Sequence, residues 1–334
     1  MNREGQAKHI SATLSGVFGA EPESVWQGPE EGWLYRPRFL AKKVKDMVYI
    51  GLPSARGQVF DLWDCPHLPR EQRALLERIK RFFKEEGVSF YDKRIGRGKI
   101  SGIGFCGSPD PKSLVVSLIT RLPVRSRLLG EKISRLSGDI TGVCEECEGK
   151  VWSLFGEHHY FHRIGRAIYR MTPGGVWPEN PFLHEAIIGT IKEMVRPGAR
   201  IAEAGVGYFL GLALAEKAKS VIVFDTKPDL LADTLASSEA SYTWNITITL
   251  DNLLDVDKGL ADVFLINAER GPVFAESARS LRVAEQVIVF GKDIKSLYRS
   301  HKNLTSAGFK LRRLLGFEPS PNRAEAFGLA EYGR

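Results

Sequence analysis

The sequence predicts an α/β protein with two domains, an α+β domain over residues 1–170 and a doubly wound parallel sheet over residues 171–334. Three observations lead to this prediction. Strands and helices alternate regularly in the second half, and a loop with two glycines joins the first of these strands to its helix. The whole excess of basic residues lies in the first half.

The first 170 residues carry mixed helix and strand patterns. Apolar residues at helical spacing predict a helix over Gln6–Phe18 that ends at Gly19, and another over Glu71–Glu86 that ends at Gly87. Aromatic and β-branched residues over Trp33–Ile50, interleaved with lysine and arginine, predict a strand hairpin with one cationic face. The remaining predicted elements are strands over Ile100–Phe105 and Leu114–Ile119, a helix over Ser126–Leu136, and strands over Val151–Phe155 and Tyr160–Ile168.

The second half begins with a predicted helix over Pro181–Val195, which ends before Pro197 and Gly198. Short apolar strands separated by helices are typical of a parallel sheet, whose ligands bind at the carboxyl ends of its strands. The predicted elements are the strand Arg200–Ala204, the helix Phe209–Ala218, the strand Val221–Asp225, the helix Leu230–Ala240, and the strands Ile246–Leu250, Val263–Asn267 and Val287–Gly291.

The charge distribution separates the two halves. Residues 1–170 carry 28 Lys and Arg against 20 Asp and Glu, whereas residues 171–334 carry 19 against 20. A basic domain beside a neutral one fits a module that holds a polyanion next to one that holds a small ligand, although a basic surface that binds nothing has the same composition. The candidates for phosphate contact are Arg36, Arg38, Lys42, Lys43, Arg94 and Arg97.

Nothing in the sequence predicts export or membrane insertion. No apolar run approaches the ~18 residues that span a bilayer, and Met1–Ala20 lacks the apolar centre of a signal peptide. Four cysteines are too few for a disulfide scaffold in 334 residues. We expect a cytoplasmic protein with reduced thiols.

A glycine loop follows the first predicted strand of the second half. Its residues Glu203, Gly205 and Gly207 let the backbone approach a ligand closely and direct helix N–H groups towards it, although a tight strand-to-helix turn fits the same residues. Asp225 ends the second strand, where a carboxylate can accept hydrogen bonds from both hydroxyls of a ribose, and Asp251 follows the third. The pattern favours an adenosine-type cofactor.

A second motif offers a competing, zinc-binding interpretation. Cys144 and Cys147 are followed after ten residues by His158, with His162 four positions further on, which approaches the C-x2-C…H-x3-H spacing of a zinc site. The intervening segment, Val151–Phe155, has the pattern of a core strand, which favours a structural role for this part of the chain.

Four segments resemble motifs of the RNA uridine-C5 methyltransferase family. Ile201–Phe209, with the sequence I-A-E-A-G-V-G-Y-F, corresponds to the family's D-L-Y-C-G-x-G-x-F. Pro173–Asn180, P-G-G-V-W-P-E-N, corresponds to P-x-x-F-F-Q-x-N. Tyr35–Arg38 and Asp61–Cys65 match its Y-R-x-(K/R) and D-x-x-x-C segments, so the resemblance spans nearly the whole chain.

The resemblance implies a class I methyltransferase fold, which is a Rossmann-like doubly wound sheet, for residues 171–334 and an RNA-binding α+β domain for residues 1–170. It implies S-adenosyl-L-methionine (SAM) as the cofactor and tRNA or rRNA as the partner. The implied cofactor-binding residues are Glu203, Gly205, Gly207, Tyr208, Asp225, Asp251 and Asn267.

The chain departs from the family at its catalytic motifs. The family's D-P-P-R-x-G appears as N-A-E-R-G over Asn267–Gly271, and its S-C-N-P falls on F-G-K-D over Phe290–Asp293, so Gly291 stands at the position of the family's cysteine. Glu325 takes the place of the proton acceptor if one residue is inserted in the last motif, F-P-x-T-x-H-x-E. Some members hold an iron–sulfur cluster with four cysteines, and only one of these has a counterpart in this chain, Cys65. The family's N-terminal oligonucleotide-binding barrel has no counterpart in this sequence.

The missing cysteine removes the step on which uridine-C5 chemistry depends. A thiolate must add to uracil C6 before C5 can take the SAM methyl group, and no cysteine follows Cys147. We therefore expect a SAM-dependent RNA methyltransferase homologue that has lost this chemistry. Transfer to nitrogen or oxygen needs no covalent intermediate, so Glu325 or Glu269 is a candidate base. The alternatives are a catalytically inactive RNA-binding protein and a zinc-binding nucleic-acid-binding protein.

Overall fold

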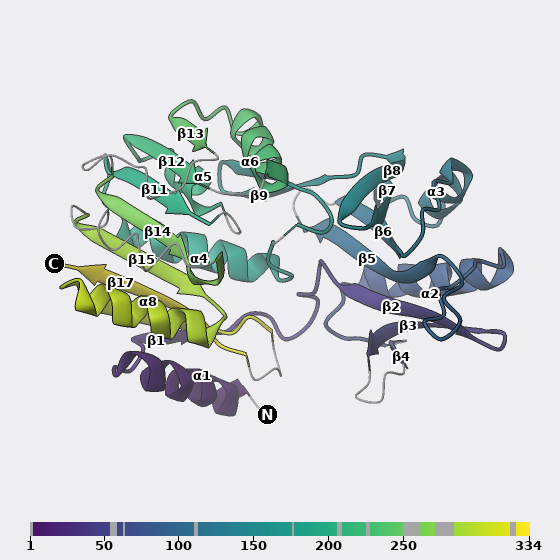
Figure 1. The fold of residues 1–334 in the computed structure, drawn as a ribbon, viewed down its shortest axis with the longest axis horizontal. Coiled ribbons are helices and arrows are strands. Elements are labelled where there is room, and N and C mark those ends of the chain that lie inside the picture. The colour runs from purple at the N-terminus through teal and green to yellow at the C-terminus, as the bar shows by residue number, and fades with distance from the viewer. Residues whose placement is uncertain are drawn as a thin grey trace. The chain divides into compact units, whose positions relative to one another are not determined.

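The computed structural model describes residues 3–53, 59–62, 64–109, 113–175, 177–205, 209–224, 228–249, 261–270, 284–320 and 325–334. The chain divides into two compact units, the first of residues 1–29, 164–169 and 182–334 and the second of residues 30–163 and 170–181 (Figure 1). Each unit has a large sheet of its own. None of the helices in the described ranges has the length and apolar content needed to span a bilayer.

The first unit is built on an eight-stranded sheet in the order β1-β16-β17-β15-β14-β11-β12-β13. Five neighbouring strands are parallel: β11 (Arg200–Ala204), β12 (Ser220–Phe224), β13 (Ile246–Thr249), β14 (Val263–Asn267) and β15 (Gln286–Gly291). The remaining strands are β17 (Phe327–Gly333), which is antiparallel to both its neighbours, β16 (Lys310–Phe317), and β1 (Ser24–Trp26), which is parallel to β16. The predicted doubly wound sheet is confirmed.

Helices cover this sheet, and its central strands are buried at every position, as in a sheet that is packed on both faces. Among the described residues, the α-helices of the unit are α1 (Arg3–Phe18), α4 (Pro181–Met194), α5 (Leu210–Leu214), α6 (Pro228–Ala240) and α8 (Ile294–Ser306). Because α1 and α8 lie side by side against the sheet, their residues Leu14 and Leu297 join Ala202 and Val287 in one core cluster (Figure 1).

The first 29 residues belong to this unit, which differs from the predicted division at residue 170. Helix α1 buries Ile10, Leu14 and Phe18 in the core of the unit, and β1 extends the sheet beyond β16. The helix predicted over Gln6–Phe18 is therefore present. Its apolar face predicted the helix itself but could not predict which of the two sheets the helix covers.

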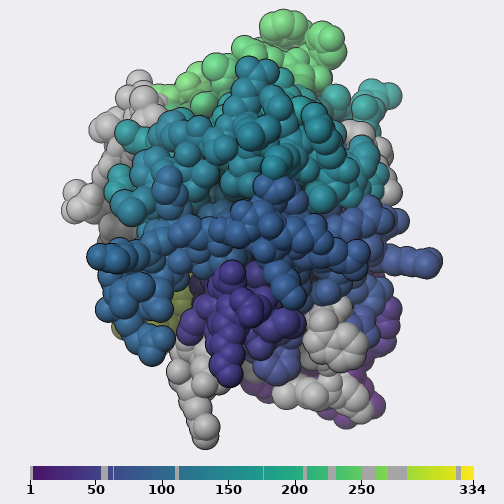
Figure 2. All heavy atoms as spheres, turned by 90° about the vertical axis from the view of Figure 1, so that its right-hand side faces the viewer, coloured from purple at the N-terminus to yellow at the C-terminus, as the bar shows by residue number. Residues whose placement is uncertain are grey.

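The second unit is built on a seven-stranded sheet in the order β4-β3-β2-β5-β6-β7-β8. Its strands are β2 (Arg38–Val44), β3 (Met47–Pro53), β4 (Val59–Asp61), β5 (Ile100–Ser108), β6 (Ser113–Thr120), β7 (Ile140–Cys147) and β8 (Lys150–Gly156). All pairs are antiparallel except β6 and β7, which are joined by α3 (Arg127–Ser134). Helix α2 (Arg70–Glu85) completes the unit, whose surface is blue and teal in Figure 2. A separate hairpin contains β9 (Tyr160–Ile164) and β10 (Ala167–Met171).

Strand β7 was not predicted, and it carries two buried glutamates in sequence, Glu145 and Glu146. A buried carboxylate is stable only where hydrogen bonds and opposite charges replace its lost hydration. Thr120 Oγ1 donates to Glu145 at 2.8 Å, and Arg38 forms an ion pair with Glu146 at 2.6 Å. The hydroxyl of Ser117 also donates to Glu146.

Candidate functional site

The carboxyl ends of β11 and β14 mark the point where the chain order of the first sheet reverses. Strands β12 and β13 continue from β11 on one side, whereas β14 and β15 continue on the other. Ligands of open parallel sheets bind in the crevice at such a reversal. The structure brings Glu203, Gly205 and Asn267 to this edge. Four other predicted cofactor residues lie outside the described residues: Gly207, Tyr208, Asp225 and Asp251.

Glu203 is fully buried, and its carboxylate caps the helix that follows the glycine loop. Oε1 accepts the N–H of Leu210 at 3.0 Å, and Oε2 accepts that of Gly211 at 2.7 Å. A Cβ at Gly211 would lie only 2.9 Å from Oε2 and 2.6 Å from Val221 Cγ1, so this close approach requires glycine. The first N–H groups of α5 are therefore bonded to Glu203, and a contact between this side chain and a cofactor stays a prediction.

Gly205 forms the turn at the end of β11. Its φ is +78°, in the left-handed region that favours glycine, and its N–H donates to the carbonyl of Phe224 at 3.1 Å. The turn thus accounts for one of the two loop glycines structurally, before any role in ligand binding is considered.

The ends of β14 and β15 place a carboxylate beside position 291. Asn267 is buried and its Oδ1 accepts the N–H of Glu269 at 3.0 Å, while Oε1 of Glu269 accepts the N–H of Lys292 at 2.6 Å. A Cβ on Gly291 would lie 3.4 Å from that same Oε1. Glu269 is exposed, so its second oxygen can take a proton from a bound molecule.

A buried cluster of aromatic rings lies within electrostatic reach of Glu203. The ring of Tyr169 is 4.9 Å from that of His184 and 6.3 Å from that of Phe209, between ring centres. Burial, together with the Glu203 carboxylate, raises the pKa of Tyr169 well above its usual value, so its hydroxyl stays protonated at neutral pH. The sequence did not predict this cluster, because no spacing links a strand residue to a helix residue fifteen positions later.

The structure does not bring the residues of the zinc interpretation together as a metal site. Cys144 and Cys147 are three positions apart on β7, so their side chains point to opposite faces of the strand. His162 is buried, with its Nδ1 2.8 Å from the hydroxyl of Ser108. Across the described ranges, no group of three or more His, Cys, Asp or Glu side chains is arranged to hold a metal ion.

Two of the six basic residues predicted to contact phosphates are engaged inside the second unit. Arg36 is buried, donates to the carbonyl of Pro178 and lies with its guanidinium 5.5 Å from the ring centre of Tyr160. Arg38 is half-exposed and pairs with Glu146. Arg36 therefore does not lie at the surface where a phosphate contact was predicted, because its guanidinium is buried and contacts Pro178 and Tyr160.

The other four basic residues lie at the surface. Lys43, Arg94 and Arg97 are exposed, and Lys42 is half-buried. Because Lys42 and Lys43 are adjacent on β2, their side chains point to opposite faces of the strand. Arg38 and Lys42 therefore share one face of β2 while Lys43 lies on the other, and phosphate contact by these residues stays a prediction.

No protein-family model matches the chain. The tRNA (uracil(54)-C(5))-methyltransferase of Pyrococcus horikoshii is 23% identical over 180 residues, which cover 51% of this chain and 42% of that protein. The 23S rRNA (uracil(747)-C(5))-methyltransferase of Actinobacillus succinogenes is 21% identical over an alignment of 332 residues, which covers 90% of this chain and 84% of that protein. The chain is a relative of the RNA uracil-C5 methyltransferases.

The fold agrees with this relationship to the RNA uracil-C5 methyltransferases. The crystal structure of the Pyrococcus abyssi tRNA (uracil-54, C5)-methyltransferase, in complex with S-adenosyl-L-homocysteine, matches with a TM-score of 0.83 and 18% identity, over 99% of this chain and 84% of that one. The predicted class I methyltransferase fold is thereby confirmed. The chain spans less than half of the Pyrococcus horikoshii relative and most of the Actinobacillus succinogenes relative.

The relationship to the uracil-C5 methyltransferases makes the position of each thiol informative. All four cysteines are free, and the three in β5 and β7 are buried, namely Cys106, Cys144 and Cys147. Burial raises the pKa of Cys144 to about 12 and raises that of Cys106 more strongly. Because only the thiolate is a strong nucleophile, these two buried groups are inert at neutral pH. Cys65 is half-buried.

Proposed function

We propose that this chain is a SAM-dependent RNA methyltransferase homologue of the tRNA and rRNA modification type, in which uridine-C5 chemistry has been lost. The observation that carries the proposal is the pair of Gly291 and Glu269. Position 291 has no side chain, and a carboxylate oxygen lies 3.4 Å from the place of its missing Cβ. A base without a nucleophile suits direct methyl transfer to nitrogen or oxygen, which needs positioning and no covalent intermediate.

SAM is the proposed cofactor, and the chemistry around Glu203 supports it. A buried carboxylate already caps α5, so a ligand phosphate at that helix end would meet a like charge. SAM has a cationic sulfonium and no phosphate, and when bound it supplies an electrophilic methyl group. The Pyrococcus abyssi relative contains S-adenosyl-L-homocysteine in its crystal structure. The residues proposed to hold SAM are Glu203, Gly205, Gly207, Tyr208, Asp225, Asp251 and Asn267.

Glu269 is the stronger of the two candidate bases. Its side chain is anchored by the N–H of Lys292, at the same sheet edge as Asn267. A general base must lie within hydrogen-bond reach of the proton that it removes, and an anchored carboxylate at the cofactor edge meets that need better than a free one. Glu325 is exposed and precedes β17 by two residues.

The second unit, which contains most of the basic residues of the first half and is called the basic unit below, is proposed to bind RNA through phosphates. The logarithm of its affinity should therefore fall linearly with the logarithm of the salt concentration. Replacing Lys43, Arg94 and Arg97 together by alanine should flatten that slope by about 0.7 to 0.9 for every phosphate that these side chains neutralise. Fluorescence anisotropy with labelled tRNA over a salt series measures the slope.

The matched control for this triple variant removes the same charge from the other unit. Lys295, Arg299 and Lys302 lie on α8, and their replacement by alanine should leave the slope as it is in the unmodified protein. Binding that is insensitive to salt, or an equal change of slope in the two triple variants, would count against phosphate binding by the basic unit.

A catalytically inactive RNA-binding protein is the second candidate, favoured by the loss of the family's cysteine at Gly291. The two candidates separate when the protein is incubated with methyl-labelled SAM and bulk tRNA or rRNA. Label recovered in N-methylated or O-methylated nucleosides identifies an enzyme. RNA binding with no transfer of label identifies the inactive alternative.

A further inference from the structure

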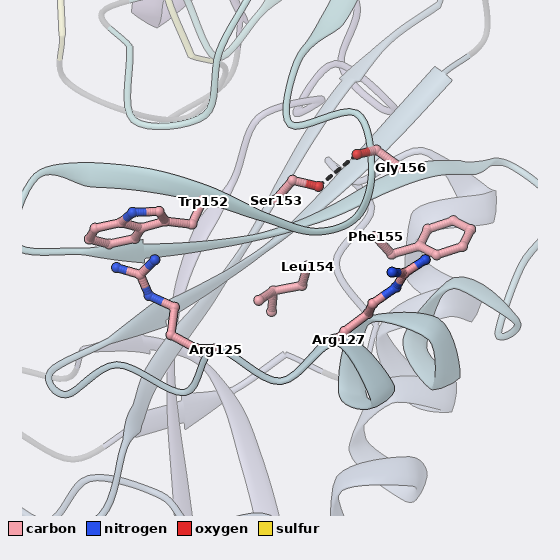
Figure 3. Close-up of a pocket in the computed structure, with 7 residues that line it drawn as sticks. All are labelled: Arg125, Arg127, Trp152, Ser153, Leu154, Phe155 and Gly156. Atoms are coloured by element: carbon pink, nitrogen blue, oxygen red, sulfur yellow. Dashed lines mark hydrogen bonds between the residues drawn. The ribbon is translucent and has the colours of Figure 1, made fainter.

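A pocket in the second unit is lined by arginine and aromatic side chains that the phosphate-contact predictions did not include. Its volume is about 620 Å³, within the range of about 300–1,000 Å³ that is usual for small-ligand sites. Arg125 lines it from the segment before α3, and Arg127 lines it from the first position of α3. Trp152, Leu154 and Phe155 line it from β8 (Figure 3).

The buried carboxylate of Glu145 fixes the backbone on one side of this pocket. Glu145 accepts the N–H of Val124 at 2.6 Å and that of Arg125 at 3.0 Å, besides the hydroxyl of Thr120. These bonds hold Arg125 at a φ of +48°, a left-handed conformation that a non-glycine residue adopts only when its surroundings impose it. The position of the Arg125 side chain is therefore determined by a buried anchor.

The guanidinium of Arg125 lies over an aromatic ring. Its guanidinium carbon is 3.5 Å from the ring centre of Trp152, and its Nε is 3.6 Å from Glu145. The Arg125 side chain is 46% exposed, so the stacked pair borders solvent. Figure 3 shows the guanidinium under the indole, with Leu154 pointing into the space beside them. We call these two side chains the Arg125–Trp152 platform.

The same arrangement recurs along the segment that leads to this platform. Residues 121–127, R-L-P-V-R-S-R, contain three arginines and no acidic residue. Arg121 lies 5.9 Å from the ring centre of Tyr91, and Arg127 lines the same pocket as Phe155 (Figure 3). The Arg127 side chain is 88% exposed and its Nε pairs with Glu131 at 3.2 Å, so an incoming anion would compete with a solvent-exposed ion pair.

Planar cations and aromatic rings at a solvent border are the features that bind unpaired nucleotides. Bases stack on indole and guanidinium faces whatever their sequence, while neighbouring arginines pair with the phosphates. An acidic peptide would use the charges but would leave the stacked faces unused. We propose that the Arg125–Trp152 platform, with Arg127 and Phe155, binds an unpaired stretch of the RNA substrate; this inference rests on the proposed function.

The test measures binding of the full chain to a labelled single-stranded RNA and to the same sequence as a duplex, at one salt concentration. Trp152→Ala should weaken binding of the single strand about 5- to 100-fold, the usual loss for one stacked base, and Trp152→Phe should recover most of it. Arg125→Lys keeps the charge but loses the planar face, so this variant should retain only part of the affinity of the unmodified protein.

The matched control is Trp244→Ala, because Trp244 is 86% exposed in the other unit and its loss should leave binding unchanged. A second measurement needs no variant at all. Photocrosslinking of the unmodified protein to RNA that contains 5-iodouridine should label the peptide that carries Trp152 and Phe155.

Several outcomes overturn the proposal. They are unchanged binding by Trp152→Ala with crosslinks elsewhere, equal affinity for the duplex, and displacement of the RNA by polyglutamate. If the unmodified protein binds RNA with a normal salt dependence while the platform variants have no effect, only the platform is wrong. If the unmodified protein binds no RNA, the platform and the RNA half of the proposed function are both wrong.

Discussion

RNA incubated with this protein and SAM should contain no newly formed 5-methyluridine. The first unit contains no cysteine, and the thiols of Cys106 and Cys144 are buried and protonated at neutral pH. Where an enzyme forms a covalent intermediate, loss of the nucleophile costs on the order of 10⁶ in rate. Mass spectrometry of the nucleosides measures the product, and RNA that contains 5-fluorouridine should give no shifted band on a denaturing gel, because the trapped adduct requires the same thiolate.

The positive control for this experiment is the Pyrococcus horikoshii relative, named as a uracil-54 C5-methyltransferase, which should give the product in the same assay. A shifted band with the present protein would contradict the prediction and would point to a thiol of the other unit. Alkylation under native conditions identifies the accessible thiol, and we expect half-buried Cys65 to react before Cys106 or Cys144.

Replacing Glu203 by alanine should destabilise the first unit by about 3 kcal/mol, since two buried N–H groups then lose their acceptor. Those groups belong to Leu210 and Gly211, and α5 is too short to compensate within itself. A loss of this size is a large part of the free energy of unfolding of a typical domain, which is about 5–15 kcal/mol. Urea unfolding, followed by intrinsic fluorescence, measures the change in free energy of unfolding.

The matched control for Glu203→Ala is Glu325→Ala, because both remove a carboxylate from the same unit. Glu325 is exposed, so its loss should change the free energy of unfolding by less than about 0.5 kcal/mol. Equal stability of the two variants would show that the Glu203 carboxylate does not stabilise the start of α5.

The parallel sheet was predictable from the sequence because its central strands are buried on both faces. Such strands appear as continuous apolar runs between turns, and two of them, Arg200–Ala204 and Val263–Asn267, have the predicted bounds. The position of Gly291 at the end of β15 was predictable for the same reason, since the apolar run Val287–Gly291 ends there.

The second unit was harder to predict because several of its charges are buried. Glu145 and Glu146 interrupt the apolar pattern of β7, and the spacing of the cysteines around them offered a zinc site as a competing interpretation. Their partners, Thr120 and Arg38, lie far away in the sequence, so no local pattern shows that these carboxylates are hydrogen-bonded or paired with a charge. The prediction for Arg36 was wrong for a similar reason. A basic residue in a basic half is typically a surface charge, whereas the contacts of Arg36 are internal.

Calorimetric titration of the full chain with SAM tests the central claim most directly. We expect saturable heat for a single site and competition by S-adenosyl-L-homocysteine. Asp225→Ala should weaken binding by about 1–3 kcal/mol, because the ribose hydroxyls would lose a charged acceptor. Absence of heat at high SAM concentration, with the protein folded and able to bind RNA, would contradict the claim that this chain is a SAM-dependent methyltransferase homologue.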